Sequence, residues 1–164
     1  MKAFLLGIIA LMTLVSCGGD SEEASDSSSW ISKDNARELA QRYGTCSSIY
    51  GFSVLYLKDM YMQTNDSSLR TLINMDAHDH AIYKILLTEH VQAQPQEKQD
   101  VLIQTANRFM NEQLISKDLN GPLLVKMKSE FCPDGTISRE EKGRIMSEYQ
   151  ASYEQVVDQI KGGM

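Results

Sequence analysis

The sequence lacks the short motifs that commonly mark catalytic sites. It contains no G-x-S-x-G, no H-E-x-x-H, no C-x-x-C and no glycine-rich phosphate-binding loop. It also lacks segments in which apolar and polar residues alternate, the pattern typical of a half-buried β-strand. The first absence leaves an enzymatic function without support. The second predicts an all-α fold.

Positive charge is also scarce. The chain has 16 lysine and arginine residues against 22 aspartate and glutamate residues, which gives a formal net charge of -6. Affinity for nucleic acid comes mainly from basic side chains that neutralise phosphates, so this composition argues against a nucleic-acid partner. The same acidity disfavours adhesion to an anionic membrane surface by charge alone.

The apolar run near the N-terminus is too short to span a membrane. It covers Ala3–Val15, well below the roughly 20 residues that a transmembrane helix needs. Lys2 precedes it, and residues 14–17 read Leu-Val-Ser-Cys. This arrangement resembles the lipobox of bacterial lipoprotein precursors. The alternative is an ordinary secretory signal with an incidental cysteine.

The resemblance implies a location for the mature protein. In that family the cysteine is alkylated with diacylglycerol, the peptide is cut before it, and the new amino group is acylated, commonly with palmitate. Residues 1–16 are then a signal peptide, and the lipid on Cys17 is the only non-protein group expected. Several acyl chains anchor a protein stably. Because Gly18 rather than Asp follows, the resemblance favours the outer membrane, with the domain facing the periplasm or the surface.

A polar segment separates this cysteine from the rest of the chain. Gly18–Ser29 contains one alanine and no larger apolar side chain, so it cannot bury enough surface to offset its ordering entropy. We expect residues 17–29 to be the lipidated cysteine and a disordered tether, with a reach of about 20 Å. Residues 30–164 are then the helical domain.

This domain is predicted to be a small bundle of four to five helices. Apolar residues recur with the 3.6-residue period of amphipathic helices, and turn signals separate the segments. The expected helices cover about 33–63, 67–93, 95–117, 122–131 and 139–161. In the second helix the expected core positions are Leu72, Met75, Ile82, Ile85 and Leu86.

Two cysteines, Cys46 and Cys132, lie within the domain. In an exported protein they are expected to form one disulfide; the alternative is a pair of buried free thiols. Gly44, Ser48 and Gly51 place small residues along one side of the first helix, so a neighbouring helix can approach closely there. We expect the fourth helix to be that neighbour, with its cysteine closing the bridge.

The segment 130–141 resembles the second half of an EF-hand calcium loop. Oxygen-bearing side chains fall at Asp134, Thr136, Ser138 and Glu141. The front of the loop departs from the pattern, because a cysteine stands where an oxygen ligand is expected. The alternative is a Pro-Asp-Gly turn followed by a capping box at the start of the last helix, which uses the same residues.

The histidines do not form a metal-binding pattern. On a helix, His78 and His80 point about 200° apart, so they cannot share an ion. Asp76 and His80 lie one turn apart, but a third ligand is not evident. We therefore expect no metal at these positions, a packed His78, and solvated side chains at His80 and His90.

Aromatic residues crowd the first helix on several sides. One helix of a small bundle cannot bury all of them, so Tyr50, Phe52 and Tyr56 are candidates for a partner-binding patch. The alternative is that the first helix is central and surrounded by the others.

Together, these features predict a lipid-anchored, disulfide-containing helical protein of the bacterial cell envelope. We expect it to act by binding another envelope protein, as an adaptor, an assembly factor or an immunity-type inhibitor. The alternative is an envelope lipoprotein that binds a small ligand or calcium.

Overall fold

The protein is all-α in the part that its computed structural model describes, residues 30–109, 112, 114, 119–133 and 135–162. Six helices and no β-strand occur in this part. They are α2 (Trp30–Thr64), α3 (Ser68–Gln92), α4 (Gln96–Phe109), α5 (Gly121–Phe131), α6 (Arg139–Glu148) and α7 (Gln150–Lys161). The predicted fold class is confirmed, with one helix more than expected. The third predicted helix corresponds to α4 as far as Phe109, and most of its predicted remainder lies outside the described residues.

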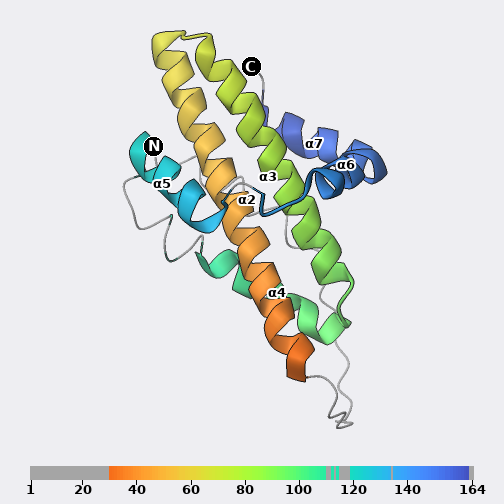
Figure 1. The fold of residues 1–164 in the computed structure, drawn as a ribbon. Coiled ribbons are helices and arrows are strands. Elements are labelled where there is room, and N and C mark those ends of the chain that lie inside the picture. Colours follow the sequence, from red (N-terminus) through yellow and green to blue (C-terminus); the bar gives the residue numbers. More distant parts are fainter. Residues whose placement is uncertain (1–29, 110–111, 113, 115–118, 134, 163–164) are drawn as a thin grey trace.

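A long antiparallel hairpin of α2 and α3 is the frame of the domain (Figure 1). The 35 residues of α2 extend over about 52 Å at 1.5 Å per residue. In the turn, Asn65 adopts a φ of 53°, a left-handed conformation that asparagine tolerates, and its N–H donates to the Tyr61 carbonyl. The Asp66 carboxylate then accepts a hydrogen bond of 2.9 Å from the N–H of Ser68, where α3 begins.

The shorter helices lie along this frame. α4 and α5 pack mainly against α2, whereas α6 and α7 pack mainly against α3. The connection from α5 to α6 crosses the hairpin (Figure 1), and Ile137 within this crossover is buried in the core. The crossover therefore links the helices that cover α2 to those that cover α3.

One main core joins the hairpin to α5, the crossover, α6 and α7. The largest fully buried side chains are Ile49, Ile73, Leu114, Leu124, Ile145, Val54 and Cys46. A smaller cluster of Ala40, Val91 and Leu102 fills the space where α4 meets the other end of the hairpin. Aliphatic packing thus holds the short helices on the frame.

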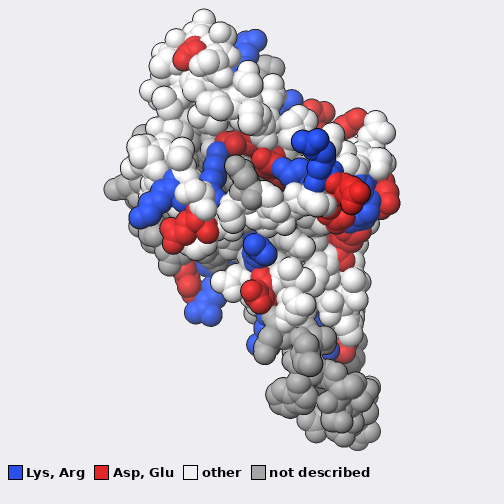
Figure 2. Space-filling model, viewed as in Figure 1, with Lys and Arg blue, Asp and Glu red and all other residues white. Residues whose placement is uncertain are grey.

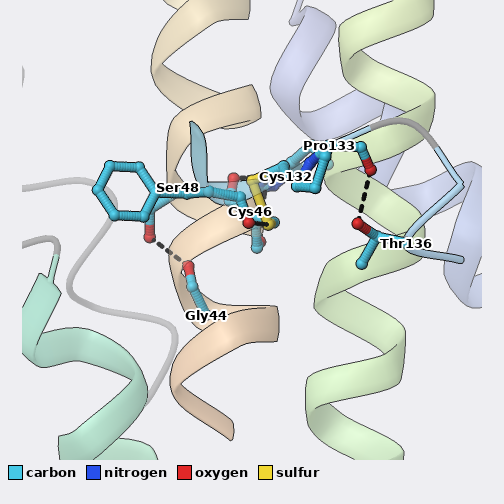
Figure 3. Close-up of a disulfide and its surroundings, with 9 residues drawn as sticks. Gly44, Cys46, Ser48, Cys132, Pro133 and Thr136 are labelled. Carbon is cyan, nitrogen blue, oxygen red and sulfur yellow. Dashed lines mark hydrogen bonds between the residues drawn. A yellow bond between two sulfur atoms is a disulfide. The ribbon is translucent and has the colours of Figure 1, made fainter. Parts of the chain in front are cut away.

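A disulfide joins the middle of α2 to the end of α5 (Figure 3). The Cα atoms of Cys46 and Cys132 lie 5.7 Å apart, within the normal range, and both residues are buried. Cys132 is also the C-terminal cap of α5, where its N–H donates to the carbonyl of Lys128. The predicted pairing of the two cysteines is confirmed in its geometry.

The segment predicted as one last helix is divided at Tyr149, where φ is -114° and ψ is 28°. The two halves are held at different positions along α3. The Tyr149 hydroxyl donates to Glu89, whereas Tyr153 contacts His78. These two α3 residues are separated by about 16 Å of helix, but four residues of a straight helix advance only about 6 Å. The bend at Tyr149 reconciles the two contacts.

The two glycines in the stretch of small residues of α2 face helices other than the predicted fourth one. A Cβ atom added to Gly44 would lie 2.6 Å from the Cβ of Ala106 in α4. A Cβ atom added to Gly51 would lie 3.0 Å from Nδ1 of His80 in α3. The prediction that this stretch packs against the fourth helix holds at Cys46, which is bonded to Cys132 at the end of α5, but not at the two glycines. A run of small residues shows that some helix can approach closely, but not which one.

We predict that Gly44→Ala lowers the free energy of unfolding by about 1–3 kcal/mol, because the added methyl group would overlap Ala106, including its carbonyl oxygen. Gly143→Ala is a matched control in α6, where an added Cβ has no neighbour within 4 Å. It should be neutral or stabilise by up to about 1 kcal/mol through helix propensity. Urea denaturation measures both. Equal stability of the two variants would contradict close packing at Gly44.

We predict that replacing both Cys46 and Cys132 by alanine lowers the free energy of unfolding by about 4 kcal/mol, because the bridge closes a loop with a sequence separation of 86. In the wild-type protein unfolded in guanidinium chloride, alkylation without reductant followed by mass spectrometry should label neither residue. Labelling of both cysteines would show that they are free thiols.

Candidate functional site

The calcium candidates that the structure describes form hydrogen bonds and an ion pair with other groups of the crossover and α6. Thr136 Oγ1 donates to a carbonyl of the turn, and Ser138 Oγ accepts from the N–H of Glu141 at 3.0 Å. The Glu141 carboxylate binds Arg144 at 2.7 Å. These contacts correspond to the turn and the helix cap of the alternative interpretation. Asp134 lies outside the described residues, and within them no group of three or more His, Cys, Asp or Glu is placed to hold a metal ion.

The three aromatic candidates do not share one exposed patch. Each is half-buried: Tyr50 and Phe52 pack against the main core, and Tyr56 lies against Gly121 of α5. Tyr50 also stacks on Tyr83 of α3, with ring centroids 5.8 Å apart and an angle of 15° between the planes. For these side chains, α2 is a central helix whose aromatic residues pack against its neighbours.

A cluster of three hydrogen-bonded polar side chains lies between the hairpin and α5. The buried carboxylate of Asp76 in α3 accepts hydrogen bonds from Ser53 Oγ of α2 at 2.6 Å and from Lys128 Nζ of α5 at 2.5 Å. The Lys128 ammonium also lies 5.2 Å from the centroid of the Tyr50 ring. This group was not predicted from the sequence, although a carboxylate among the core-facing positions of α3 was a sign of it.

His80 is enclosed between α3 and α2. Its Nδ1–H donates to the Ser47 carbonyl at 2.7 Å, and the absence of a side chain at Gly51 leaves room for the ring. Loss of hydration on burial lowers the pKa of His80 to about 4. The hydrogen bond to Ser47 opposes this shift, and the charge of Lys84 adds a smaller lowering.

The other two histidines also have partners. His90 Nε2–H donates to the Ala36 carbonyl at 2.9 Å. His78 stacks on Tyr153, with ring centroids 5.5 Å apart, and its Nδ1 contacts the tyrosine hydroxyl. His80 and His90, which were predicted to be solvated, are partly buried and hydrogen-bonded. His78, which was predicted to be packed, is exposed apart from its contact with Tyr153. The partners of His80 and His90 were not predicted. Their partners come from α2, which is distant in the sequence.

Arg144 joins α6 to α3 through carboxylates. Its guanidinium binds Glu89 of α3 at 2.6 Å, and Glu141 and Glu148 of α6 at 2.7 and 2.9 Å. The hydrogen bonds from Arg144 lower the pKa of Glu89 and of Glu141. This network joins α6 to α3, and Glu89, Glu141 and Glu148 share the guanidinium of Arg144.

Three of the eight large apolar side chains that are exposed in the described part of the chain lie at the free end of the hairpin. Met62 in the last turn of α2 is 74% exposed, and Leu72 and Met75 near the start of α3 are 46% and 58% exposed. This end, residues 60–75, is called the hairpin tip below. It protrudes beyond the shorter helices in Figure 1, and in Figure 2 it carries few charged side chains. Where such side chains form one contiguous apolar patch, the patch is typical of an interaction site.

The hairpin tip was not predicted from the sequence. Leu72 and Met75 were expected in the core together with Ile82, Ile85 and Leu86; the last three are buried, and the first two are not. The period shows which side of α3 is apolar, but not how far along α3 the covering segments extend.

Cys17 and the expected tether lie outside the described residues, so the lipid anchor stays a prediction. In the described part of the chain, no helix combines the length and the apolar content that crossing a bilayer requires. No protein-family model, curated protein or solved structure matches the chain.

We predict that His80 makes the domain less stable as the pH falls from about 6.5 to about 4. In this window an unfolded histidine binds a proton, whereas folded His80, with a pKa of about 4, does not. The unfolded state then binds more protons, so the free energy of unfolding falls by up to about 3 kcal/mol. Urea denaturation at a series of pH values measures this. An equally steep pH dependence in His80→Gln would contradict it.

Proposed function

We propose that this chain is a lipid-anchored binding protein of the bacterial cell envelope, which engages another envelope protein through the hairpin tip. The observation that carries the proposal is the exposure of Met62, Leu72 and Met75 at the free end of the hairpin. The engaged protein determines whether the chain serves as an adaptor, an assembly factor or an immunity-type inhibitor.

The chemistry of the tip suits a protein partner. Methionine side chains are flexible and polarizable, so they adapt to apolar surfaces of different shapes. Uncharged polar residues lie among them and can form a hydrogen-bonding rim: Gln63, Thr64, Asn65, Thr71 and Asn74. The charge of Arg70 is engaged within the tip, because its Nε donates to the Tyr61 hydroxyl and its guanidinium lies over that ring.

The position of the tip suits a protein held at its N-terminus. Residue 30 begins α2 and Met62 lies in its last turn, so about 48 Å of helix separates them. A lipid on Cys17 and the tether of residues 17–29 would hold the domain at the membrane from the end opposite to the tip. The rigid α2 then carries the apolar side chains tens of ångströms away from the point of attachment.

We predict that a photoreactive amino acid at Met62 or Met75 captures one envelope protein in intact cells, because these side chains contact the partner. Val101 is a matched control, since it is also apolar and is 42% exposed but lies in α4, away from the tip. Mass spectrometry of the captured complexes identifies the partner. Capture at Val101 as strong as at Met62, or no capture at either tip position, would contradict the proposed role.

The lipid anchor is tested in the same cells by incorporation of labelled palmitate. The wild-type chain should incorporate the label, and Cys17→Ser should not, because the residue that carries the lipid is gone. Labelling that persists in Cys17→Ser would place the lipid elsewhere.

A further inference from the structure

An ammonium group is enclosed at the point where α5 meets the hairpin. Lys128 Nζ lies 2.5 Å from Oδ2 of Asp76, a side chain that is only 11% exposed. The same oxygen accepts a hydrogen bond of 2.6 Å from Ser53 Oγ. Nζ also lies 5.2 Å from the centroid of the Tyr50 ring, which is stacked on Tyr83. A carboxylate and the face of an aromatic ring are both favourable partners for an ammonium ion.

The groups that receive this ammonium belong to the hairpin, and the ammonium itself comes from α5. Ser53 and Tyr50 lie in α2, and Asp76 and Tyr83 lie in α3. Ser53 orients the carboxylate, and Tyr83 supports the Tyr50 ring, without a contribution from α5. These four hairpin residues are called the ammonium site below.

We propose that the ammonium site binds a primary ammonium group, which Lys128 supplies from within the chain and a lysine of a protein partner supplies in its place. The assignment of the incoming group to a partner's lysine rests on the proposed function. The ability of the site to bind a primary ammonium does not.

Lys128 can leave the site without a movement of α5. Its side chain is 23% exposed, and its flexible four-carbon stem can turn toward solvent. α5 stays in place because the disulfide holds Cys132 and because Leu124 and Met127 are buried. An incoming ammonium replaces the charge that leaves, so the exchange does not leave Asp76 as an unpaired buried carboxylate.

The ammonium site adjoins the hairpin tip. Leu72 precedes Asp76 by four residues in α3, so the two side chains lie on one face of the helix, one turn apart. A partner that covers Leu72 with an apolar side chain can therefore bring a lysine to Asp76. The net charge of -6 favours the approach of such a basic partner.

Replacement of Lys128 tests the site with a soluble amine. Lys128→Ala should lower the Tm by about 5 °C or more, because Asp76 loses its cation. Ethylammonium chloride at about 0.5 M should then raise the Tm of this variant by about 2–5 °C above its value in the same concentration of NaCl. The wild type, in which the site is filled, and Lys128→Ala combined with Asp76→Asn should show no such difference.

The test also works if Lys128→Ala is unfolded in NaCl at room temperature. Circular dichroism should then show a folded fraction that rises with ethylammonium and not with sodium. An equal response of Lys128→Ala to the two salts overturns the ammonium site, and so does an ethylammonium response that survives Asp76→Asn.

Exchange in the wild type is tested with Nα-acetyl-lysine amide, followed by the NMR signals of Ser53 and Tyr50. The amide should bind the wild type about tenfold more weakly than Lys128→Ala, because Lys128 competes for the site. The Nε-acetylated form should not bind either protein. No change in the wild-type signals at about 1 M amide, where the Lys128→Ala signals are largely shifted, overturns the exchange.

These measurements need neither a membrane nor a partner. Failure of the amine to bind therefore overturns the ammonium site and leaves the proposed function standing. Failure of capture at the hairpin tip, with amine binding intact, overturns the proposed function and leaves the ammonium site standing.

Discussion

The buried carboxylate of Asp76 is the constraint on which the position of α5 on the hairpin depends. A carboxylate inside a helix interface costs several kcal/mol unless it is both paired and hydrogen-bonded. Ser53 meets this need from α2, and Lys128 meets it from α5. α5 must therefore lie where its lysine reaches Asp76, and one turn later Cys132 meets Cys46. The crossover to α6 therefore begins at Cys132, which the disulfide holds against α2.

Features that depend on neighbouring residues were predictable from the sequence. The helical period gave most of the helices, the Ser138 cap follows from its spacing to Glu141, and two cysteines within one domain gave the disulfide. Features that depend on which helix lies opposite were not predictable. Gly44 packs against Ala106 of α4 and Gly51 against His80 of α3. The sequence around the two glycines does not indicate that these helices, and not α5, lie opposite them.

The candidate site shows the same division between local and distant causes. The apolar side of α3 follows from its period, but Ile82 and Leu86 are buried whereas Met75 is exposed. Burial depends on where the crossover and α6 reach α3, and Arg144 with Glu89 and Lys142 with Asp79 set that position. These ion pairs join segments more than fifty residues apart, so a sequence pattern cannot locate them.

The hairpin carries both proposed contact sites, and the short helices decide how much of each is accessible. α6 reaches α3 at Asp79 and leaves the hairpin tip exposed. Lys128 of α5 occupies the ammonium site with a side chain that is 23% exposed. A partner that binds both places gains apolar contact at Leu72 and exchanges one ammonium for another one turn away. Because the exchange conserves charge, the apolar contact supplies the affinity, and the match of a lysine to Asp76 supplies the register.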